Sequence, residues 1–517
     1  MDLEFVLPDL TDVCPGSVAS ALPEAALQAR YVDTPDLRLM RWGITLRHRV
    51  ESVEGSGQVS QWTVKLPEDA GGVALVRHEL SWPGPFGPVP PEVASLVRAA
   101  ARTQPLGPVA SLNTQRRRVE LSAADGTRLA EVDDDIVSVM DGDQVASRFR
   151  EVEVELTPAA SPDLLKAVVE RLVRAGAVEG DNRPKVVRAI GPRAEQPPDV
   201  AIPKVGPYST VAQVVAAAIA SALTRIIRHD PGLRLGDDPE HVHQARVGTR
   251  RLRSDLRTFG SLIDAVWLDR TRSELRWVGN ALGEVRDADV LSERLRADIA
   301  TLPPVDSRDA GAILRRLASE RDEARGRVLE ELDSDRYVAL LEDLTAAAAD
   351  PPTTGDGRAG DVLPPLVHKR WRRLKRSVEA LGQDPPDPAL HQVRIQAKRL
   401  RYASEAAIGV IGSSARNLAS AVAKVQTVLG DHQDAVVAEG WLRKFGSSNS
   451  AGPNSASPDS TSPDSTSPNS VTQALVAGEL IAIQRQRQQE TRAAWTEPWN
   501  AASRPRLRTW LKPKRKS

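Results

Sequence analysis

The chain repeats one basic pattern 148 positions apart, and this repeat constrains its fold more than any other feature. Residues 241–253 read HVHQARVGTRRLR, and residues 389–401 read ALHQVRIQAKRLR. Both contain His-Gln-x-Arg, an aliphatic residue and a basic cluster that ends in Arg-Leu-Arg. Downstream, LGEVRDADV at 282–290 resembles LGDHQDAVV at 429–437. Helical periodicity dominates this part of the chain, so a duplicated multi-helix unit explains all of these matches.

In each copy the basic residues lie on one face of the predicted helix. At 100° per residue, those of the first copy fall within an arc of about 80°. This first stripe contains His243, Arg246, Arg250, Arg253 and Arg257. The second stripe contains His391, Arg394, Lys398 and Arg401. On the helix before each stripe, the same offset aligns two further pairs, Arg225 with Arg373 and Arg228 with Arg376.

Two basic helices of this kind indicate a polyanionic ligand. They repel one another unless an anion lies between them, and arginine forks bind phosphate oxygens well. A solvated face is the alternative, but such a face usually interleaves acids four residues away, and the first stripe has none. His243 and His391 remain open between core imidazoles and phosphate contacts. Duplex nucleic acid is a further competitor, although no helix-turn-helix or zipper pattern occurs and side chains that read base edges are sparse.

These motifs resemble the CHAD domain, a histidine-containing α-helical domain that binds polyphosphate. The resemblance rests on HxxRVxxRRLR followed by HxxRIxxKRLR in a helical array, and it covers residues from about 207 to 500. It implies that inorganic polyphosphate binds in a basic cavity. The ligands that it implies are Arg225, Arg228, His243, Arg246, Arg250, Arg253, Arg373, Arg376, His391, Arg394, Lys398 and Arg401.

The first 190 residues or so have the alternating pattern of β-strands instead. Runs such as ITLRHRV, QWTVKL, RLAEVDDDIVSV and FREVEVEL are separated by clusters of Gly, Pro, Ser and Asp. Charges recur at every second position, so they share one face of each strand. For any single strand, simple exposure of a polar face is the alternative. Several faces of opposite charge instead indicate a sheet closed into a polar tunnel, in which acids hold divalent cations and bases hold phosphates.

The strings YVDTPDLRLMRWGITLRHR, WTVKLP, RHELS, LAEVDDDIVSV and FREVEVEL, in this order, resemble the CYTH domain of the triphosphate tunnel metalloenzymes. The resemblance covers residues 1–192 and implies hydrolysis of a triphosphate, with Mg²⁺ or Mn²⁺ as the cofactor. It implies triphosphate contacts by Arg47, Arg49, Lys65, Arg116, Arg118 and Lys185. The implied metal ligands are Glu4, Glu131, Asp133, Glu151 and Glu153. The implied catalytic residues are Glu151, Glu153 and Lys65.

One departure from the family pattern leaves catalysis open. Members of the family begin with ExExK, in which two acids bind metal and the lysine helps to position water or phosphate, whereas this chain begins with MDLEFVLPD. Glu4 keeps one acid, but no lysine stands between it and Pro8. The sequence therefore predicts phosphate binding and a possible inorganic triphosphatase, with a catalytically inactive polyphosphate-binding or targeting protein as the alternative. An adenylate cyclase, also known in this superfamily, is disfavoured because nothing marks a base pocket.

The predicted fold class is α+β, with an N-terminal antiparallel β-barrel tunnel and flanking helices, then an all-α domain made of two duplicated multi-helix units. We expect the tunnel domain at 1–192, a proline-rich linker at 193–207 and the helical domain at 208–500. A low-complexity insertion falls at 446–470, where the chain is too polar to fold. Residues 501–517 are predicted to form a basic tail.

Composition narrows the setting and the partners. Lys and Arg together number 69, as do Asp and Glu, so a net charge of zero conceals local fields. The single cysteine, Cys14, excludes an internal disulfide framework and fits a reducing compartment. The sequence contains no run of 18 apolar residues, so it predicts no membrane span. We expect a cytoplasmic protein that binds inorganic polyphosphate or tripolyphosphate, with association with polyphosphate granules left open and nucleic acid only as a nonspecific partner of the basic tail.

Overall fold

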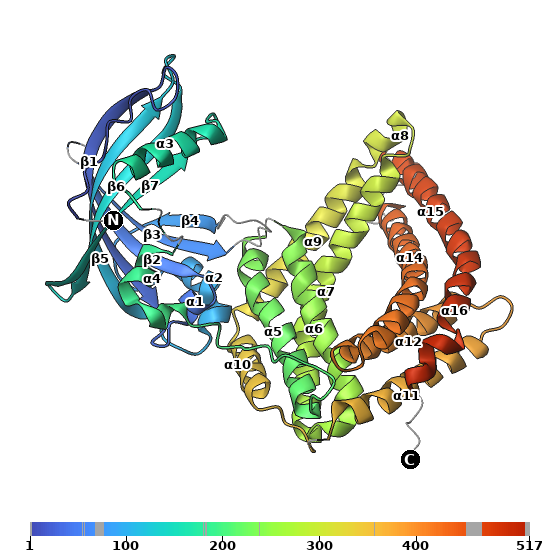
Figure 1. Ribbon diagram of the computed structural model, residues 1–517. Helices are drawn as coiled ribbons and strands as arrows, with labels where there is room; N and C mark the ends of the chain where they lie inside the picture. The colour runs from blue at the N-terminus through green and yellow to red at the C-terminus, as the bar shows by residue number, and fades with distance from the viewer. Residues whose placement is uncertain are drawn as a thin grey trace, which may run out of the picture. The chain divides into compact units, whose positions relative to one another are not determined.

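The structure is a computed structural model and describes residues 3–53, 55, 57–67, 77–178, 180, 183–236, 238–355, 357–450 and 468–511. The chain divides into a first unit, Met1–Asp199, and a second unit, Val200–Ser517. The first unit contains the strands and the second is helical, as Figure 1 shows by the colours along the chain. The division falls inside the segment predicted as a linker.

Alternating polar and apolar residues form the strands of the first unit, as the sequence predicts. The strands are β1 (Val18–Asp33), β2 (Thr45–Val53), β3 (Gly57–Pro67), β4 (Arg77–Pro83), β5 (Gly107–Ser122), β6 (Arg128–Asp141) and β7 (Gln144–Leu156). They form one antiparallel sheet in the order β4-β3-β2-β1-β5-β6-β7. The flanking helices are α1 (Arg38–Arg41), α2 (Pro91–Ala101), α3 (Pro162–Arg174), α4 (Lys185–Ile190) and the 3₁₀-helix η1 (Pro192–Glu195).

The predicted antiparallel sheet with flanking helices is confirmed, but its predicted closure into a barrel needs correction. β4 and β7 are the two edges of the sheet, and no pairing joins them within the described residues. Closure requires every strand to pair on both sides. The segment before β1 adds no strand, because residues 3–17 form turns and irregular structure.

The two faces of this sheet differ in polarity because successive side chains point to opposite sides. On one face α3 covers an apolar core that includes Phe5 and Val132. Ser161 caps this helix, since its hydroxyl accepts a hydrogen bond from the backbone N–H of Asp163. The other face carries the charged side chains of the candidate site.

The end of the first unit includes part of the predicted linker. Arg41 Nε donates to the Pro197 carbonyl at 2.8 Å, and Trp42 Nε1 donates to the Asp199 carboxylate at 2.9 Å. The guanidinium of Arg102 also pairs with Asp199. These contacts hold the chain against the sheet unit as far as Asp199, so the first residues of the expected linker are part of a folded unit.

Helices with apolar stripes build the second unit. They are α5 (Val211–Leu235), α6 (Pro239–Phe259), α7 (Ala265–Ile299), α8 (Pro304–Asp309), α9 (Gly311–Leu332), α10 (Asp335–Ala349), α11 (Ala359–Glu379), α12 (Asp387–Ala406), α13 (Ile408–Ile411), α14 (Ser413–Ser450), α15 (Pro468–Ala494) and α16 (Thr496–Ala502), with the 3₁₀-helices η2 (Gly260–Leu262) and η3 (Pro505–Leu511). Side-chain caps fix several starts: Thr210 and Gln213 form a capping box at α5, and Asp238 caps α6.

The two halves of the second unit share one packing order, which agrees with the predicted duplication. In the first half α5 packs on α6, α6 on α7 and α7 on α9. In the second half α11 packs on α12, α12 on α14 and α14 on α15. Figure 1 shows the first set in green to yellow and the second in orange to red. The two helices that carry the repeated motif, α6 and α12, also contact each other.

The C-terminal end of the chain differs from its prediction as a basic tail. α16 and η3 continue the fold: Leu511 is buried, and the guanidinium carbon of Arg508 lies 4.3 Å from the centroid of a Trp371 ring. The expected tail is therefore wrong as far as Leu511, and residues 512–517 lie outside the described part. Of the predicted insertion at 446–470, the first five residues end α14 and the last three begin α15, while the rest lies outside the described residues.

Within the described residues, α5 alone is long and apolar enough to cross a membrane by length and composition. Of its apolar window, 56% is buried inside the protein. A core helix of a soluble protein passes the same test, so α5 is weak evidence for a membrane. The architecture is compatible with the cytoplasmic location that the sequence predicts.

Candidate functional sites

The charged face of the sheet borders a cavity of about 910 Å³ in the first unit. Side chains from all seven strands and from the segment around α4 line it. Acidic side chains come mainly from β6 and β7, and basic side chains come from β2, β3, β5 and α4. Because both signs of charge meet in one hollow, the cavity can hold a cation and an anion together.

Three carboxylates meet on β6 and β7 and are called the carboxylate cluster below. The strand register pairs Asp135 with Glu151 and sets Glu153 opposite Asp133. One oxygen from each of Asp135, Glu151 and Glu153 lies within 4.8 Å of the others. Hard oxygen ligands of this kind suit Mg²⁺ or Mn²⁺. The donor set therefore fits the divalent ion that the family resemblance implies.

Arg116 on β5 holds two acidic side chains of β6. Its Nε and Nη2 donate to the two carboxylate oxygens of Asp135, at 2.8 and 2.7 Å, and its Nη1 pairs with Asp133. Burial raises the pKa of the Asp133 carboxyl to about 7; the charge of Arg116 opposes this rise, and the nearby Glu131 adds to it. The fork thus fixes the position of Asp135, whereas Asp133 is protonated in about half of the molecules at pH 7.

Lys185, the first residue of α4, also contacts the cluster. Its ammonium lies 3.1 Å from Asp135, 2.6 Å from Glu151 and 2.8 Å from Glu153. One turn later, Arg188 Nη1 donates to Glu151 at 2.8 Å. All three carboxylates of the cluster therefore have a basic partner.

Basic side chains with spare donors lie on β2 and β3. Arg47 and Arg49 line the cavity, and their buried Nε atoms lack a hydrogen-bond partner among the described residues. Lys65 pairs with Glu79 at 2.7 Å because the strand register sets them opposite each other. Burial and the charge of Arg47 lower the pKa of Arg49. This side of the cavity can therefore bind the oxygens of a phosphate chain.

The structure brings most of the predicted tunnel residues into this cavity. Those that line it are Arg47, Arg49, Lys65, Arg116, Glu131, Asp133, Glu151, Glu153 and Lys185. Arg118 is not among the lining residues, because its guanidinium instead donates to the Pro23 carbonyl at 3.1 Å.

The predicted metal ligand Glu4 does not line the cavity either. It is exposed in a turn, and the backbone carbonyls on either side of it, those of Leu3 and Phe5, accept hydrogen bonds from Arg150. Arg150 pairs with Asp134, whose side chain points to the other face from those of its two neighbours. The segment around Glu4 thus lies on the α3 side of the sheet, away from the carboxylate cluster.

Four cavity residues were not predicted from the sequence: Asp135, which is a candidate metal ligand, and Glu79, Arg183 and Arg188. The period of two already sets Asp135 on the face of Asp133, so this signal was sufficient. Glu79 follows only from the strand register that pairs it with a lysine. The two arginines carry no local signal, because tertiary structure alone brings the segment around α4 to the sheet.

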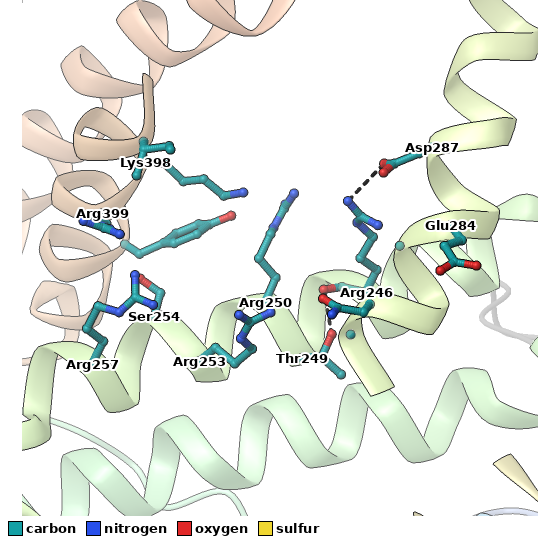
Figure 2. Close-up of a pocket in the computed structure, with 15 residues that line it drawn as sticks. Arg246, Thr249, Arg250, Arg253, Ser254, Arg257, Glu284, Asp287, Lys398 and Arg399 are labelled. Carbon is teal, nitrogen blue, oxygen red and sulfur yellow. Dashed lines mark hydrogen bonds and ion pairs between the residues drawn. The ribbon is translucent and has the colours of Figure 1, made fainter. Parts of the chain in front are cut away.

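A second cavity, of about 500 Å³, lies among α6, α7 and α12 of the helical unit. Figure 2 shows basic side chains from two helices around it, namely Arg246, Arg250, Arg253 and Arg257 of α6 with Lys398 and Arg399 of α12. Two acids of α7, Glu284 and Asp287, line one side, and Arg246 Nη2 donates to Asp287 at 3.0 Å. The bases outnumber the acids, so the cavity favours an anion.

Burial and the repulsion between neighbouring positive charges lower the pKa of two bases in this cavity. Burial and the positive charges of Arg250 and Arg394 lower the pKa of the Lys398 ammonium from 10.5 to about 7. Burial and the charge of Arg399 lower the pKa of Arg257 to about 10. The buried Nε atoms of Arg250 and Arg399 lack a hydrogen-bond partner in the described helices. An anion in the cavity would offset the repulsion between these bases and could accept hydrogen bonds from the unpaired Nε atoms.

A neighbouring cavity of about 620 Å³ lies between α5, α6 and α12, and it shares Arg250 and Tyr402 with the 500 Å³ cavity. Its other basic lining residues are Arg225, His243, Arg251 and Arg401. Burial and the charge of Arg286 lower the pKa of His243. The imidazole of His243 thus lines a cavity and does not lie in the apolar core. Because its pKa is lowered, it is mostly neutral at pH 7.

Five predicted polyphosphate ligands line neither helical cavity. Arg228 is exposed on α5, and Arg373 and Arg376 are exposed on α11. His391 is half-buried, and its Nδ1 lacks a hydrogen-bond partner within the described range. Arg394 extends toward α14. Conversely, Arg399 and Tyr402 line a helical cavity without having been predicted as ligands, although Arg399 directly follows the predicted ligand Lys398.

The matching segments LGEVRDADV at 282–290 and LGDHQDAVV at 429–437 also have a structural role. Gly283 of α7 leaves room for Arg246, because an added Cβ would collide with its Nη1. Gly430 of α14 also lies beside an arginine, Arg394, but an added Cβ would be 3.8 Å from its Nε, which is ordinary contact and no collision. In both copies an aspartate follows four residues after the glycine, and in the first copy this is the acid that binds the arginine. Both segments thus have a glycine beside an arginine of the basic stripe and an aspartate four residues later.

Comparison with known proteins agrees with both units. The family model of the CYTH domain matches residues 20–186, and that of the CHAD domain matches residues 217–443. Two uncharacterized proteins of Mycobacterium tuberculosis are similar over most of the chain: MT2285 of strain CDC 1551 / Oshkosh and Rv2226 of strain ATCC 25618 / H37Rv. Each is 32% identical over 470 residues, which cover 83% of this chain and 84% of the relative.

Two solved structures also resemble parts of the chain. PptA from Streptomyces chartreusis has 27% sequence identity and a TM-score of 0.44, over 56% of this chain and 100% of that one. The CHAD domain from the plant Ricinus communis has 25% identity and a TM-score of 0.46, over 59% of this chain and 95% of that one.

Proposed function

The chain belongs to the family of proteins in which a CYTH domain is followed by a CHAD domain, and from this premise we propose that it binds inorganic phosphate chains in both units. Polyphosphate binds in the helical unit. A short chain such as tripolyphosphate binds in the cavity of the first unit and is hydrolysed there with the help of Mg²⁺ or Mn²⁺. A cytoplasmic location, with association with polyphosphate granules, belongs to the same proposal.

The observation that carries the proposal is the surplus of bases in the cavity among α6, α7 and α12. Six basic side chains line it, and two helices contribute them. Burial and the charges of Arg250 and Arg394 lower the pKa of the Lys398 ammonium to about 7. A single phosphate would contact only a few of these groups. A chain of phosphates can contact bases that follow one another at successive turns of α6, and it needs no base readout.

In the first unit, the two sides of the cavity have different tasks. Arg47, Arg49 and Lys65 bind phosphate oxygens, and the carboxylate cluster binds the divalent ion. When bound, this ion neutralises charge on the phosphate oxygens. A carboxylate at the edge of the cluster, with Glu153 the more exposed candidate at 46% of its side chain, orients the attacking water.

A catalytically inactive binding protein is the second candidate, and specific observations favour it. The lysine of the family's opening motif is missing, and the segment around Glu4 lies on the α3 side of the sheet. In addition, Lys185 already contacts every member of the carboxylate cluster. Such a protein would hold phosphate chains in both units without cutting them.

Polyphosphate binding is tested by isothermal titration with long-chain polyphosphate. The double variant Arg250→Ala/Lys398→Ala should bind at least about tenfold more weakly, since charge-assisted hydrogen bonds contribute about 1.5–3 kcal/mol each. The matched control, Arg373→Ala/Arg376→Ala, removes two bases from the exposed face of α11 and should change the affinity much less. Equal losses in both double variants would mean nonspecific attraction and would remove the proposed cavity.

Hydrolysis is tested by phosphate release from tripolyphosphate with Mg²⁺ or Mn²⁺. Glu153→Gln should lose most of the release while keeping its shape, and Glu170→Gln, on the exposed side of α3, is the matched control. Release by the native protein that depends on metal and on Glu153 supports the enzyme. No release by a protein that still binds tripolyphosphate favours the inactive binding protein.

A further inference from the structure

Lys185 occupies the middle of the carboxylate cluster. Its Nζ lies within 3.1 Å of all three carboxylates, the same three whose oxygens are within 4.8 Å of one another. An ammonium has three N–H donors, so it can satisfy one oxygen of each. Burial by itself would lower the pKa of Lys185, but the charges of Glu153, Asp135 and Glu151 raise it. A permanent cation of the chain itself therefore offsets part of the negative charge of the cluster.

The ammonium and a divalent ion cannot occupy this point together. A Mg²⁺ ion that coordinates the three carboxylates must lie about 2.0–2.1 Å from their oxygens. Nζ already lies between the same carboxylates, 2.6–3.1 Å from each. Two like charges at such a separation repel strongly in a partly buried site. Metal binding to the cluster therefore requires Lys185 to leave.

The structure makes Lys185 the movable member of this network. Arg116 is held by a two-pronged contact with Asp135, whereas Lys185 is a point charge on a flexible four-carbon stem at the first residue of α4. Its side chain also lines the cavity that faces Arg47 and Arg49. A phosphate oxygen that enters this cavity is an acceptor within reach of a lysine that swings away from the carboxylates.

We propose that Lys185 is a built-in counter-ion that competes with a divalent ion for the carboxylate cluster, and that a bound phosphate chain frees the cluster by accepting the ammonium. The inference rests on the proposed function for its two ligands and adds the coupling between them. Because the coupling is reciprocal, the phosphate chain tightens metal binding and the metal tightens phosphate binding. Without a phosphate chain, a divalent ion must displace this lysine by itself and therefore binds the cluster more weakly.

The test measures Mn²⁺ affinity without phosphate, from the free-ion signal in electron paramagnetic resonance. Lys185→Met should bind Mn²⁺ about 5- to 150-fold more tightly than the native protein, the range of typical coupling between sites. Lys65→Met is the matched control: it removes one positive charge from the same cavity, but Lys65 pairs with Glu79 and not with the cluster. An equal gain in both variants, or no gain in Lys185→Met, overturns the proposal.

A second measurement needs no variant and covers the case in which Lys185→Met fails to fold. Native protein is labelled with an amine-reactive acetylating reagent, and the modified lysines are quantified by mass spectrometry. Saturating Mn²⁺ should raise the labelling rate of Lys185 several-fold relative to that of Lys65, because the ammonium leaves its carboxylates. An unchanged ratio overturns the proposal.

Failure of this inference can be told apart from failure of the proposed function. Neither measurement involves hydrolysis or phosphate binding, so a protein that binds Mn²⁺ by displacing Lys185 supports the inference even if tripolyphosphate is never cut. Conversely, metal-dependent phosphate release together with Mn²⁺ affinity that ignores Lys185→Met retains the enzyme and removes the counter-ion.

Discussion

Polyphosphate binding by the helical unit should depend on pH through one side chain, Lys398. The first copy of the motif carries Arg250 at the equivalent position, and an arginine stays charged at every relevant pH. Lys398 is surrounded by arginines of α6 and α12, and its pKa falls to about 7 by burial and the charges of Arg250 and Arg394. In the absence of a ligand, about half of the molecules therefore carry a neutral amine there at pH 7.

The direction and size of the effect follow from this value. A polyanion favours the charged form, so it returns the pKa of Lys398 toward that of an ordinary lysine, about 10.4. Binding then takes up a proton, and affinity falls as pH rises above about 7 until the pKa of the bound state is reached. Between pH 7 and pH 8.5 the protonated fraction of the free protein drops, and the predicted loss of affinity is about 15-fold.

The assay is isothermal titration with long-chain polyphosphate, whose few chain ends contribute little titration, at pH 7.0 and 8.5 and in buffers of different ionisation enthalpy. Native protein should take up a fraction of a proton at pH 7 and nearly one at pH 8.5. Lys398→Arg should show neither proton uptake nor the loss of affinity, and Lys424→Arg, on the exposed surface of α14, should behave as native protein does. In the ligand-free protein, burial lowers the pKa of His243 below this window. Lys398→Arg retains His243, so any proton uptake by its imidazole would persist in that variant.

Two results would refute the reasoning. If Lys398→Arg keeps the native pH dependence, another group is responsible. If native protein binds equally well at both pH values, the amine is already charged without ligand, and the repulsion inferred from its neighbours is not felt.

Three further outcomes are expected. Arg234→Ala should lower the free energy of unfolding of the helical unit by about 3–5 kcal/mol in urea denaturation, because it leaves the fully buried Asp230 without its ion pair; a change below 1 kcal/mol would contradict this. Gly248→Ala should cost about 1–3 kcal/mol in the same experiment, since an added Cβ would lie 3.1 Å from the Ala222 carbonyl of α5. Polyphosphate affinity should fall at least about tenfold when NaCl rises from about 0.05 to about 0.5 M, because ion pairs dominate binding; affinity that ignores salt would exclude such a site.

The fold was predictable wherever a period in the sequence reports burial. The repeated motif and the matches on its flanking helices share one offset along the chain, which predicts a duplicated unit. The structure shows the same packing in both copies, with α6 between α5 and α7 and α12 between α11 and α14. The alternating strands could be inferred in the same way. Sheet closure could not, because it depends on whether edge strands pair, and no local pattern in β4 or β7 encodes a partner. The tail was misjudged since Leu511 and Arg508 find their contacts on α14 and α11, far away in the sequence.

The candidate sites were predictable to the extent that one strand or helix carries them. Period-two spacing gave Arg47 with Arg49 and Glu151 with Glu153, and helical spacing gave Arg246 with Arg250. The partners of these groups come from strand register and helix packing. Spacing within one element therefore identifies candidates, and only the fold decides which of them share a cavity.

The cavity of the first unit and the cavity of Lys398 compensate their clustered charges in different ways in the ligand-free protein. In the first unit, opposite charges of the chain pair with one another, as Lys185 does with the carboxylate cluster, so a ligand must exchange partners with the protein. In the helical unit few acids are available, and the repulsion is relieved by releasing a proton from Lys398. Binding should accordingly couple to a divalent ion in the first unit and to a proton in the second. Metal concentration and pH should then regulate the two units independently, although the same class of ligand is proposed for both.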